Sequence, residues 1–531
     1  MRDLELPGRS PVHGVNGMAA TSHTLSTATA IDVLRRGGNA MDAAIAACAV
    51  QCVVEPESTG LGGDCFCLYS PGGSGSIIAF NGSGRAPMAA TADYYLERGI
   101  RCIERQTPHS CVVPGSVDAW WQLNRDHGRL ELAELLQPAI AYARDGYPVS
   151  SRVSVDIAAQ AGTIARDPNL KRVFMAAGRT PAVGERHYQP ELAATLEAIA
   201  RGGRDAFYTG EIAADMVDYL RALGGLHTLE DFASAKGEYV TPISSEYRGC
   251  QVWECPPNGQ GVTALQLLTI MAGYKTDGVD PLSVERLHTE IEAGRLAYND
   301  RNMFVADPAF ADVPVEALLS QDHAGRLRDL IDPERALAEL PASSLPAHPS
   351  TVYITVVDKD RNACSFINTL FENFGAGLMA PKSGIVFTNR AQGFVIEPGH
   401  PNCIAPGKRP LHTIIPGMVT KGGQTVMSFG VMGGQYQAFG HMQFLTRYFD
   451  FAMDIQEAQD APRIFPLPGE HAVQMEGAIP AAVVAGLEKL GHRRVAPDKP
   501  IGGSQAIWID PDSGLLTGGS DPRKDGCALG F

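Results

Sequence analysis

The sequence has few basic residues for its length. Its 531 residues include 44 Lys and Arg against 59 Asp and Glu, which gives a formal net charge of −15. Proteins that bind nucleic acid or anionic membranes hold them mainly through clustered Lys and Arg side chains. We therefore expect neither nucleic acid nor a membrane surface among the partners of this chain.

Long apolar runs are missing as well. The longest nearly apolar run, residues 43–54, is interrupted by Gln51 and is much shorter than the ~20 residues that span a bilayer. Residues 1–9 lack the apolar core of a secretory signal. We interpret the apolar run as a buried helix and expect a cytoplasmic protein.

Metal and cofactor motifs are also lacking. The 11 cysteines are an odd number without a Cys-x-x-Cys pair, which argues against a full disulfide framework and against zinc. Residues 60–64, Gly-Leu-Gly-Gly-Asp, lack the third glycine of a dinucleotide-binding fingerprint. His288 and Glu292 lie four residues apart on an expected helix, but no third metal ligand accompanies them, so a packed or solvated pair is the simpler interpretation. We expect no metal and no cofactor.

Two hairpins, one in each half of the chain, flank a mainly helical middle. Strand-like residues 65–69 and 77–80 flank a Gly/Ser turn, and the β-branched run 351–358 returns through residues 363–370. The helical pattern covers about residues 115–340. Strands near both ends with helices between them favour an α+β sandwich whose sheets are covered by helices.

Local patterns predict further elements. Ser26 or Thr27 is a good N-cap for a helix that includes Val33. Strand signals recur at residues 384–388 and 506–509.

The junction between Ser350 and Thr351 is the most informative place for chemistry. Residues 341–350 contain three prolines and no periodic pattern, so we expect an exposed, flexible segment that leads directly into a strand. If the Ser350–Thr351 bond were cleaved, Thr351 would carry a free α-amine, with an ordinary pKa of about 8, beside its own hydroxyl. A hydroxyl with an adjacent base is an activated nucleophile. The alternative is an ordinary threonine at the start of a strand, which spacing alone favours.

Short motifs follow one another along almost the whole chain. In order they are Gly37-Gly-Asn-Ala-Met-Asp-Ala-Ala44, Gly60-Leu-Gly-Gly-Asp64, Val113-Pro-Gly115, Phe207-Tyr-Thr-Gly210, Arg295-Leu-Ala-Tyr-Asn-Asp-Arg301, the run that begins at Thr351, Asn389, Lys408-Arg-Pro410, Gly433-Gly434 and Ser520-Asp-Pro-Arg523. In this order the chain resembles the γ-glutamyltransferase family of N-terminal nucleophile hydrolases, which are made as self-cleaving proenzymes.

The resemblance implies a four-layer αββα sandwich and cleavage between Ser350 and Thr351. Residues 1–350 would form a large subunit and residues 351–531 a small one, with a homodimer of such heterodimers as a further option. Thr351 matches the nucleophile, and Thr369 matches a second threonine whose hydroxyl supports it. Gly433 and Gly434 match the pair whose backbone N–H groups form an oxyanion hole, where glycine lets the substrate approach closely. The alternatives are a plain strand threonine at position 369 and a simple tight turn at the glycines.

Several positions depart from the pattern of family members that act on glutathione. Ser83 stands where they have the Arg that holds the glutamyl α-carboxylate, and Arg85 follows two places later. Phe371 replaces an Asn that follows the second threonine.

Further departures affect the positions that hold the glutamyl amino group and carboxylate. Arg390 and Gly393 align with a Gln and an Asp that hold the amino group, and His412-Thr413 aligns with a Ser-Ser pair. Losing the Asp removes an anion that would pair with a substrate ammonium, while Arg390 adds a cation that favours a carboxylate. We therefore expect a small amide substrate with a carboxylate and no amino group.

The variant with Gly84-Arg-Ala-Pro87 and Gly433-Gly-Gln-Tyr-Gln437 is similar to the oxamate amidohydrolase branch of the family. We expect Arg85, Arg390, His412 and Thr413 to bind the substrate. The alternatives are surface ion pairs for the two arginines and a packed, hydrogen-bonded histidine at position 412. Two other functions stay open, a true γ-glutamyltransferase and an uncleaved family member that binds without catalysis.

The first prediction concerns maturation. The purified protein should separate into two chains on a denaturing gel, and N-terminal sequencing of the smaller chain should begin at Thr351. Thr351→Ala should leave one chain without amidase activity, because it removes the hydroxyl that would attack the preceding carbonyl. A variant that still matures and turns over amides at the normal rate would contradict the scheme.

Overall fold

Two stacked seven-stranded sheets form the centre of the computed structural model, which describes residues 4–5, 7–340 and 351–531. In each sheet every neighbouring pair of strands is antiparallel. The first sheet has the order β1 (Val12–Gly14), β18 (Leu516–Ser520), β17 (Gly503–Ile509), β13 (Gln424–Met432), β12 (Gly417–Lys421), β9 (Cys250–Glu254) and β8 (Ile243–Tyr247). The second has the order β19 (Cys527–Gly530), β2 (Gly17–Thr21), β10 (Val352–Asp358), β11 (Ala363–Thr369), β3 (Asp64–Ser70), β4 (Ile78–Gly82) and β7 (Glu238–Val240).

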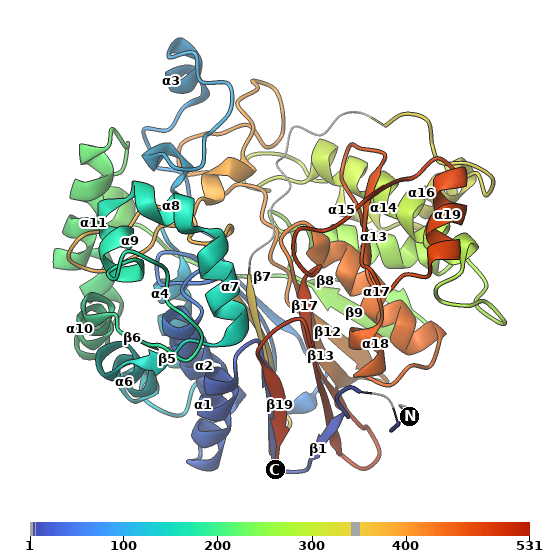
Figure 1. Cartoon of the computed structure of the whole chain (residues 1–531), viewed down its shortest axis with the longest axis horizontal. Helices are drawn as coiled ribbons and strands as arrows, with labels where there is room; N and C mark the ends of the chain where they lie inside the picture. The colour runs from blue at the N-terminus through green and yellow to red at the C-terminus, as the bar shows by residue number, and fades with distance from the viewer. Residues whose placement is uncertain (1–3, 6, 341–350) are drawn as a thin grey trace.

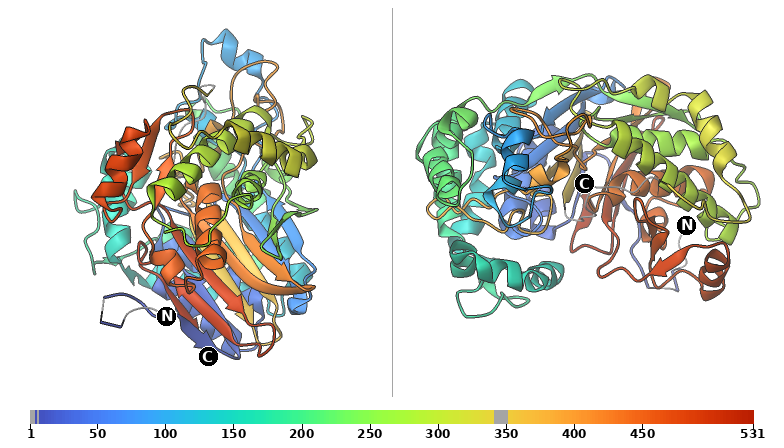
Figure 2. Two further views of the ribbon diagram at one scale, coloured as in Figure 1. Left: turned by 90° about the vertical axis from the view of Figure 1, so that its right-hand side faces the viewer. Right: turned by 90° about the horizontal axis from the view of Figure 1, so that it is seen from above.

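Helices cover the outer face of each sheet (Figures 1 and 2). On the second sheet lie α1 (Thr24–Arg35), α2 (Ala40–Val54) and α4 (Ser116–His127), backed by α6 (Gln137–Asp145), α10 (Pro190–Tyr208) and α11 (Glu211–Ala222). On the first sheet lie α13 (Gly261–Met271) and α17 (Tyr436–Asp450), backed by α14 (Val284–Phe304), α16 (Gln321–Leu330) and α19 (Ala481–Lys489). The order of layers is helix, sheet, sheet, helix, which confirms the predicted four-layer αββα fold.

Shorter elements complete the described chain. The helical ones are η1 (Pro71–Gly73), α3 (Ala92–Glu97), η2 (Pro108–Ser110), α5 (Leu132–Leu135), α7 (Ser151–Ala159), α8 (Ala161–Arg166), α9 (Pro168–Phe174), α12 (Leu229–Ala233), α15 (Val315–Leu318), η3 (Arg390–Gly393) and α18 (Glu457–Asp460). The strands are β5 (Tyr147–Pro148), β6 (Arg186–His187), β14 (Ile464–Pro466), β15 (Ala472–Met475) and β16 (Arg493–Val495).

Strand β10 contributes side chains to two hydrophobic cores, one on each face of its sheet. Ile354 and Val356 pack into the core between the second sheet and its helices, whereas Tyr353 and Val357 pack into the core between the sheets. Because alternate side chains of a strand point to opposite faces, a run of apolar residues suits a strand that is covered on both sides. The odd-numbered residues of β10 therefore face the other sheet.

Helix α2 is buried along its whole length, as the apolar run predicted. Asn39 and Asp42 form a capping box at its start, in which each side chain binds the backbone N–H of the other residue. Its alanines allow close packing on α1 and on β10. No helix in the described part of the chain is long and apolar enough to cross a membrane.

Both predicted hairpins are confirmed, β3 with β4 and β10 with β11. Two local expectations were wrong. Helix α1 begins at Thr24, because the His23 side chain accepts a hydrogen bond from Leu25 N and caps the helix before Ser26. Residues 384–388 form no strand but two isolated bridges, Val386 with Met379 and Phe387 with Gly62. The expected flexible segment, residues 341–350, lies outside the described residues, as does Ser350.

The contact between the sheets gives the second prediction. Gly430 of β13 faces Tyr353 of β10 so closely that an added Cβ would lie 2.3 Å from Tyr353 Cε2. Gly430→Ala should therefore lower the free energy of unfolding by about 1–3 kcal/mol through overpacking. Thermal unfolding measures the loss, and Gly162→Ala on α8, where an added Cβ meets nothing within 4 Å, is the control. Equal melting temperatures for the two variants would contradict this account of the sheet contact.

Candidate active site

Thr351 and Thr369 lie opposite each other at one end of the second sheet. Strand β10 pairs with β11 through Val352 and Asn368, and the same register continued by one residue sets Thr351 across from Thr369. Their Oγ1 atoms are 3.4 Å apart and both residues are buried. Since odd-numbered residues of β10 face the first sheet, the two hydroxyls lie between the sheets. The structure thus brings together the two threonines that the resemblance paired.

Gln437 orients the Thr351 hydroxyl. It lies in the first turn of α17, and its Nε2 donates to Thr351 Oγ1 at 3.2 Å, while its Oε1 accepts from Ile415 N at 3.1 Å. On the other side, Thr369 Oγ1 accepts from Phe371 N at 2.8 Å. The sequence analysis missed Gln437, although it closes the motif that begins at Gly433, because a glutamine in a helix has no distinctive spacing.

Gly433 and Gly434 form the turn between β13 and α17. Both have positive φ values, 126° and 59°, and a Cβ at Gly433 would lie 3.0 Å from Gly502 Cα, so glycine is required there. Their carbonyls accept from Tyr436 N and Gln437 N at the start of α17. Gly433 and Thr351 line one pocket. Backbone N–H groups at such a turn and helix start can stabilise a negative oxygen.

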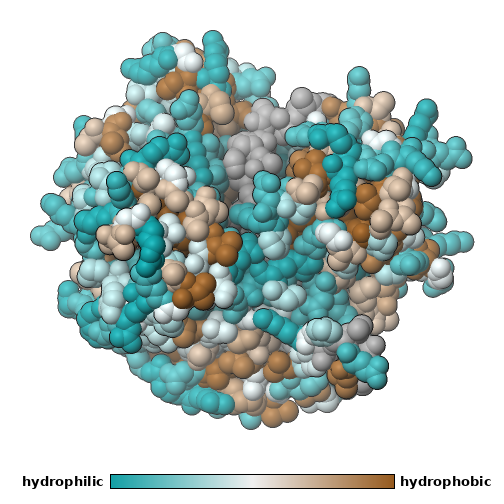
Figure 3. Space-filling model, in the orientation of Figure 1, coloured by the Kyte–Doolittle hydropathy of each residue, from teal (hydrophilic) through white to brown (hydrophobic). Residues whose placement is uncertain are grey.

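Charged residues from distant parts of the chain line the same pocket. They are Arg152, Asp156, Lys499 and Lys524, beside Asn373, Met432, Pro500 and Gly502. Arg152 Nε contacts Asp156 Oδ2 at 2.8 Å, an i,i+4 pair on α7. No motif marked these residues in the sequence, because they come from α7 and from segments near residues 499 and 524 that lie far apart along the chain. Figure 3 shows a hollow, lined largely by hydrophilic residues, between the two halves.

Arg390 belongs to a second buried group, at the start of η3. Its guanidinium lies 3.8 Å above the Phe371 ring, Nη1 donates to Thr413 Oγ1 at 3.2 Å, and Nε is 3.6 Å from Asp64 Oδ2. The side chain is fully buried, and Nε and Nη2 have no hydrogen-bond partner among the described residues. Burial lowers the pKa of Arg390 to about 9, against the opposing charge of Asp64.

His412 is fixed as a neutral side chain in the same group. Its Nδ1 accepts from Ile414 N at 3.3 Å, so the proton is on Nε2, which donates to Asp64 Oδ2 at 2.9 Å. Burial lowers the pKa of His412 to about 4, and the charge of Arg390 acts in the same direction. His412 is therefore packed and hydrogen-bonded, as the alternative interpretation stated. Its hydrogen bond to Asp64 holds that carboxylate beside Arg390.

One glutamine connects this group with the glycine turn. Gln260 Nε2 donates to Thr413 O at 2.8 Å and to Gly434 O at 3.0 Å. Arg301 Nη1 in turn donates to Gln260 Oε1 at 2.8 Å. Thr413 and Gly434 are thus both bound to a single amide group, so Arg390 lies near the glycine turn.

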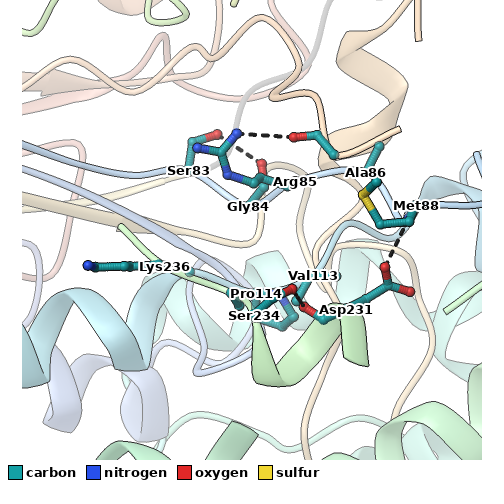
Figure 4. Close-up of a pocket in the computed structure, with 13 residues that line it drawn as sticks. Ser83, Gly84, Arg85, Ala86, Met88, Val113, Pro114, Asp231, Ser234 and Lys236 are labelled. Carbon is teal, nitrogen blue, oxygen red and sulfur yellow. Dashed lines mark hydrogen bonds between the residues drawn. The ribbon is translucent and has the colours of Figure 1, made fainter. Parts of the chain in front are cut away.

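Arg85 lies elsewhere. It lines a separate surface pocket with Asp231 and Lys236 (Figure 4), and none of the described residues that line this pocket is one of the predicted catalytic residues. Its Nη1 donates to Gly407 O at 3.1 Å, and Nη2 is 3.6 Å from Glu238. The structure therefore does not bring Arg85 together with Thr351, and its contacts are those of a partly exposed ion pair.

His288 and Glu292 both contact protein side chains, and His492 lies between them, with its Nδ1 4.0 Å from Glu292 Oε1. His288 contacts His492 at 2.7 Å and Asp332 O at 2.8 Å, and Glu292 pairs with Arg295 at 2.9 Å. In the described part of the chain no group of three or more His, Cys, Asp or Glu side chains is placed to hold a metal ion.

The four-layer fold with a threonine at the start of a central strand defines the class of N-terminal nucleophile hydrolases. A family model described as Gamma-glutamyltranspeptidase matches residues 26–531. The chain is 37% identical to the glutathione hydrolase-like YwrD proenzyme of Bacillus subtilis, over 98% of this chain and 99% of the relative. It is 34% identical to the oxamate amidohydrolase proenzyme of Klebsiella pneumoniae, over 97% and 98% respectively. The chain belongs to the gamma-glutamyltranspeptidase family and is an enzyme of that class.

The known structures agree with this assignment. The crystal structure of a cephalosporin acylase from Bacillus halodurans superimposes with a TM-score of 0.93, at 38% identity, covering 100% of this chain and 99% of the other. The family resemblance inferred from the motifs is confirmed.

The threonine pair gives the third prediction. Thr369→Val removes the hydroxyl 3.4 Å from Thr351 Oγ1 with little change in shape, so amide turnover should fall roughly 10-fold to 100-fold. Thr369→Ser, which keeps the hydroxyl, should retain most of the activity. Both variants are measured by the rate of ammonia release from the mature enzyme. If Thr369→Val is as fast as the unsubstituted enzyme, Thr369 takes no part in catalysis.

Proposed function

We propose that this chain is an autoprocessed threonine amidohydrolase that hydrolyses a small, carboxylate-bearing amide such as oxamate. Cleavage between Ser350 and Thr351 yields the large subunit, residues 1–350, and the small subunit, residues 351–531. The observation that carries the substrate class is the buried guanidinium of Arg390, whose Nε and Nη2 have no hydrogen-bond partner among the described residues.

The reaction follows from the contacts of Thr351. Its freed α-amine accepts the proton of its own hydroxyl as Oγ1 attacks the amide carbonyl. Gln437 and Thr369 hold Oγ1 in place, and the carbonyl oxygen becomes an anion that the N–H groups of Gly433 and Gly434 stabilise. The C–N bond breaks as the protonated α-amine gives its proton to the leaving amine. Water, deprotonated by the same amine, then cleaves the acyl ester.

The charges around Arg390 favour a carboxylate ligand. A guanidinium with unpaired N–H groups in a dry site forms strong charge-assisted hydrogen bonds to a carboxylate. The nearby carboxylate of Asp64 already accepts from His412 Nε2 and from Gly84 N at 2.7 Å. Glu372 is paired with Arg105 at 3.0 Å. A substrate ammonium would therefore meet the charge of Arg390 while both nearby acids have partners.

Arg390 is placed to supply the cation that an arginine at position 83 would otherwise supply to the substrate carboxylate. Ser83 precedes Gly84, whose N–H binds the same Asp64 carboxylate that lies 3.6 Å from Arg390. An arginine side chain from position 83 and the guanidinium of Arg390 would therefore reach the same region. We infer that Arg390 supplies from η3 the cation that other family members supply from the segment after β4.

The second candidate is a γ-glutamyl amide as substrate. It is favoured by the relative that is 37% identical, a glutathione hydrolase-like proenzyme. The two candidates differ in the substrate amino group, which γ-glutamyl amides carry and oxamate lacks. The third candidate is an uncleaved family member that binds without catalysis. A small subunit that begins with a free Thr351 would exclude it.

The fourth prediction tests the carboxylate site. Arg390→Ala should raise the KM for oxamate at least about 100-fold, because a charge-assisted bidentate contact is worth several kcal/mol, and Arg390→Lys should recover part of the loss. Arg85→Ala is the control and should change KM less than about threefold. Initial rates of ammonia release measure all three.

Two results would count against the proposed substrate. An unchanged KM for Arg390→Ala would remove Arg390 from the site. Faster release of p-nitroaniline from γ-glutamyl-p-nitroanilide than of ammonia from oxamate would instead support the γ-glutamyl candidate.

A further inference from the structure

A buried pair of a carboxylate and an imidazole lies behind the glycine turn. Glu254 is the last residue of β9, and His441 lies in the second turn of α17. Glu254 Oε1 is 2.6 Å from His441 Nδ1, and both side chains are fully buried. Neither residue is among the described residues that line the pocket of Thr351. Because the burial of two ionisable groups is costly, this pair calls for a reason.

The contacts of His441 fix which ring nitrogen carries its proton. Val431 N donates to His441 Nε2 at 3.2 Å, so Nε2 provides the lone pair. The proton of the neutral ring is then on Nδ1, which donates to Glu254 Oε1. A carboxylate bound to one ring nitrogen selects the tautomer and makes the other nitrogen a better acceptor. Glu254 thereby prepares His441 to accept a backbone N–H group.

His441 binds this backbone group at the point where β12 and β13 stop pairing. Strand β12 begins at Gly417, and its register continued backwards would set Ile415 opposite Val431, but the pairing does not extend to them. Val431 N instead binds His441, and Ile415 N donates to Gln437 Oε1 at 3.1 Å. Gln437 and His441 lie four residues apart on one face of α17. These two side chains replace the missing strand pair.

The two side chains of α17 connect the glycine turn with the nucleophile. Val431 lies two residues before the turn, and α17 begins two residues after it. The bond from Val431 to His441 therefore closes a loop of the chain that contains both glycines. Gln437, on the same face of the helix, donates to Thr351 Oγ1 at 3.2 Å. Helix α17 thus binds the nucleophile with one side chain and the strand before the turn with the other.

The reaction makes the spacing of these groups critical. The donors of an oxyanion hole act at about 2.7–3.1 Å from the position of the developing oxygen. A misplacement of about 1 Å, caused far from the reacting atoms, can lower a rate about 100-fold. Without His441, Val431 N would lose its acceptor, and the end of β13 would be free to move relative to α17.

We propose that His441, held by Glu254, is a positioning residue that sets the distance between the N–H groups of the glycine turn and Thr351 Oγ1. The inference rests on the proposed function in one respect, that the turn stabilises the oxyanion of an amide reaction. It does not depend on the acyl group of the substrate. Because the oxyanion develops only in the transition state, the pair contributes to kcat and not to KM.

Two amide variants of His441 separate the two contacts of the ring. In His441→Gln the side-chain oxygen lies about where Nε2 lies, so it can accept from Val431 N. In His441→Asn the amide lies near the position of Nδ1, so it keeps the contact with Glu254 and does not reach Val431. His441→Asn should lower kcat about 10-fold to 100-fold and change KM less than about threefold, whereas His441→Gln should recover most of kcat.

Initial rates with the active substrate, oxamate or γ-glutamyl-p-nitroanilide, measure both variants. The matched control is His288→Asn, which alters another buried histidine, bonded to His492 and to Asp332 O, and should leave kcat within about twofold. An unchanged kcat in His441→Asn overturns the proposal. A His441→Gln variant that is no faster than His441→Asn overturns it as well.

Glu254→Gln is a milder second variant, and it decides the question if the variants of His441 fail to fold. It keeps the shape of the acid, but its amide can also donate to Nδ1, which would place the imidazole proton against Val431 N. We expect kcat to fall about 3-fold to 10-fold at an unchanged KM. A fall in kcat alone supports positioning, and an unchanged kcat overturns it.

Hydrogen exchange separates this inference from the proposed function. Mass spectrometry follows peptides that cover residues 429–436 in the mature enzyme and in both variants of His441, without substrate. Exchange should be at least about fivefold faster in His441→Asn and unchanged in His441→Gln, because only the latter keeps an acceptor for Val431 N. Equal exchange in the two variants overturns the inference. Inactivity of the unsubstituted enzyme on both substrates overturns the proposed function instead, and the exchange measurement then decides the positioning alone.

Discussion

The antiparallel pairing of β10 with β11 is the constraint on which the candidate active site depends. Its register sets Thr351 opposite Thr369, and strand alternation turns both hydroxyls toward the first sheet. A shift of one residue would turn the inward side chains outward. Apolar residues fill both faces of β10, with Tyr353 packed directly against Gly430 of β13, so such a shift would disrupt two cores at once. Packing thereby holds the geometry of the two hydroxyls.

The burial of Arg390 has a cost that the protein offsets only in part. A guanidinium loses its hydration when it is buried, and here an aromatic ring, one hydroxyl and a carboxylate at 3.6 Å replace it. Buried polar groups in proteins are almost always hydrogen-bonded, so unpaired N–H groups in the described structure call for a functional reason. The carboxylate of the proposed substrate would provide such a reason. The neutral His412, bound to Asp64, adds no second positive charge to the group.

Positively charged side chains lie in two groups near the threonine pair. Arg390 is bonded to Thr413, which Gln260 connects to the glycine turn, and Arg152, Lys499 and Lys524 line the pocket of Thr351. Both groups present positive charge, although the chain as a whole has a net charge of −15. Local burial and pairing, and not overall composition, therefore set the electrostatics that a substrate meets. Relatives that differ in substrate can differ in these few side chains while they keep the threonine pair.

Local sequence patterns were sufficient for the hairpins, for the buried helix α2 and for the assignment of Thr351 to the start of a strand, because hydrophobic periodicity and turn residues act over a few positions. The ordered motifs were sufficient for the family and the four-layer fold. The local patterns failed at the cap of α1, where the His23 side chain replaced the expected hydroxyl. The motifs did not indicate the contact of Gln437 with Thr351 or the separate pocket of Arg85. The contact of Gln437 with Thr351 spans 86 positions of the chain, and that of Arg85 with Gly407 spans 322. Only the packing of the two sheets and their helices brings such distant segments together.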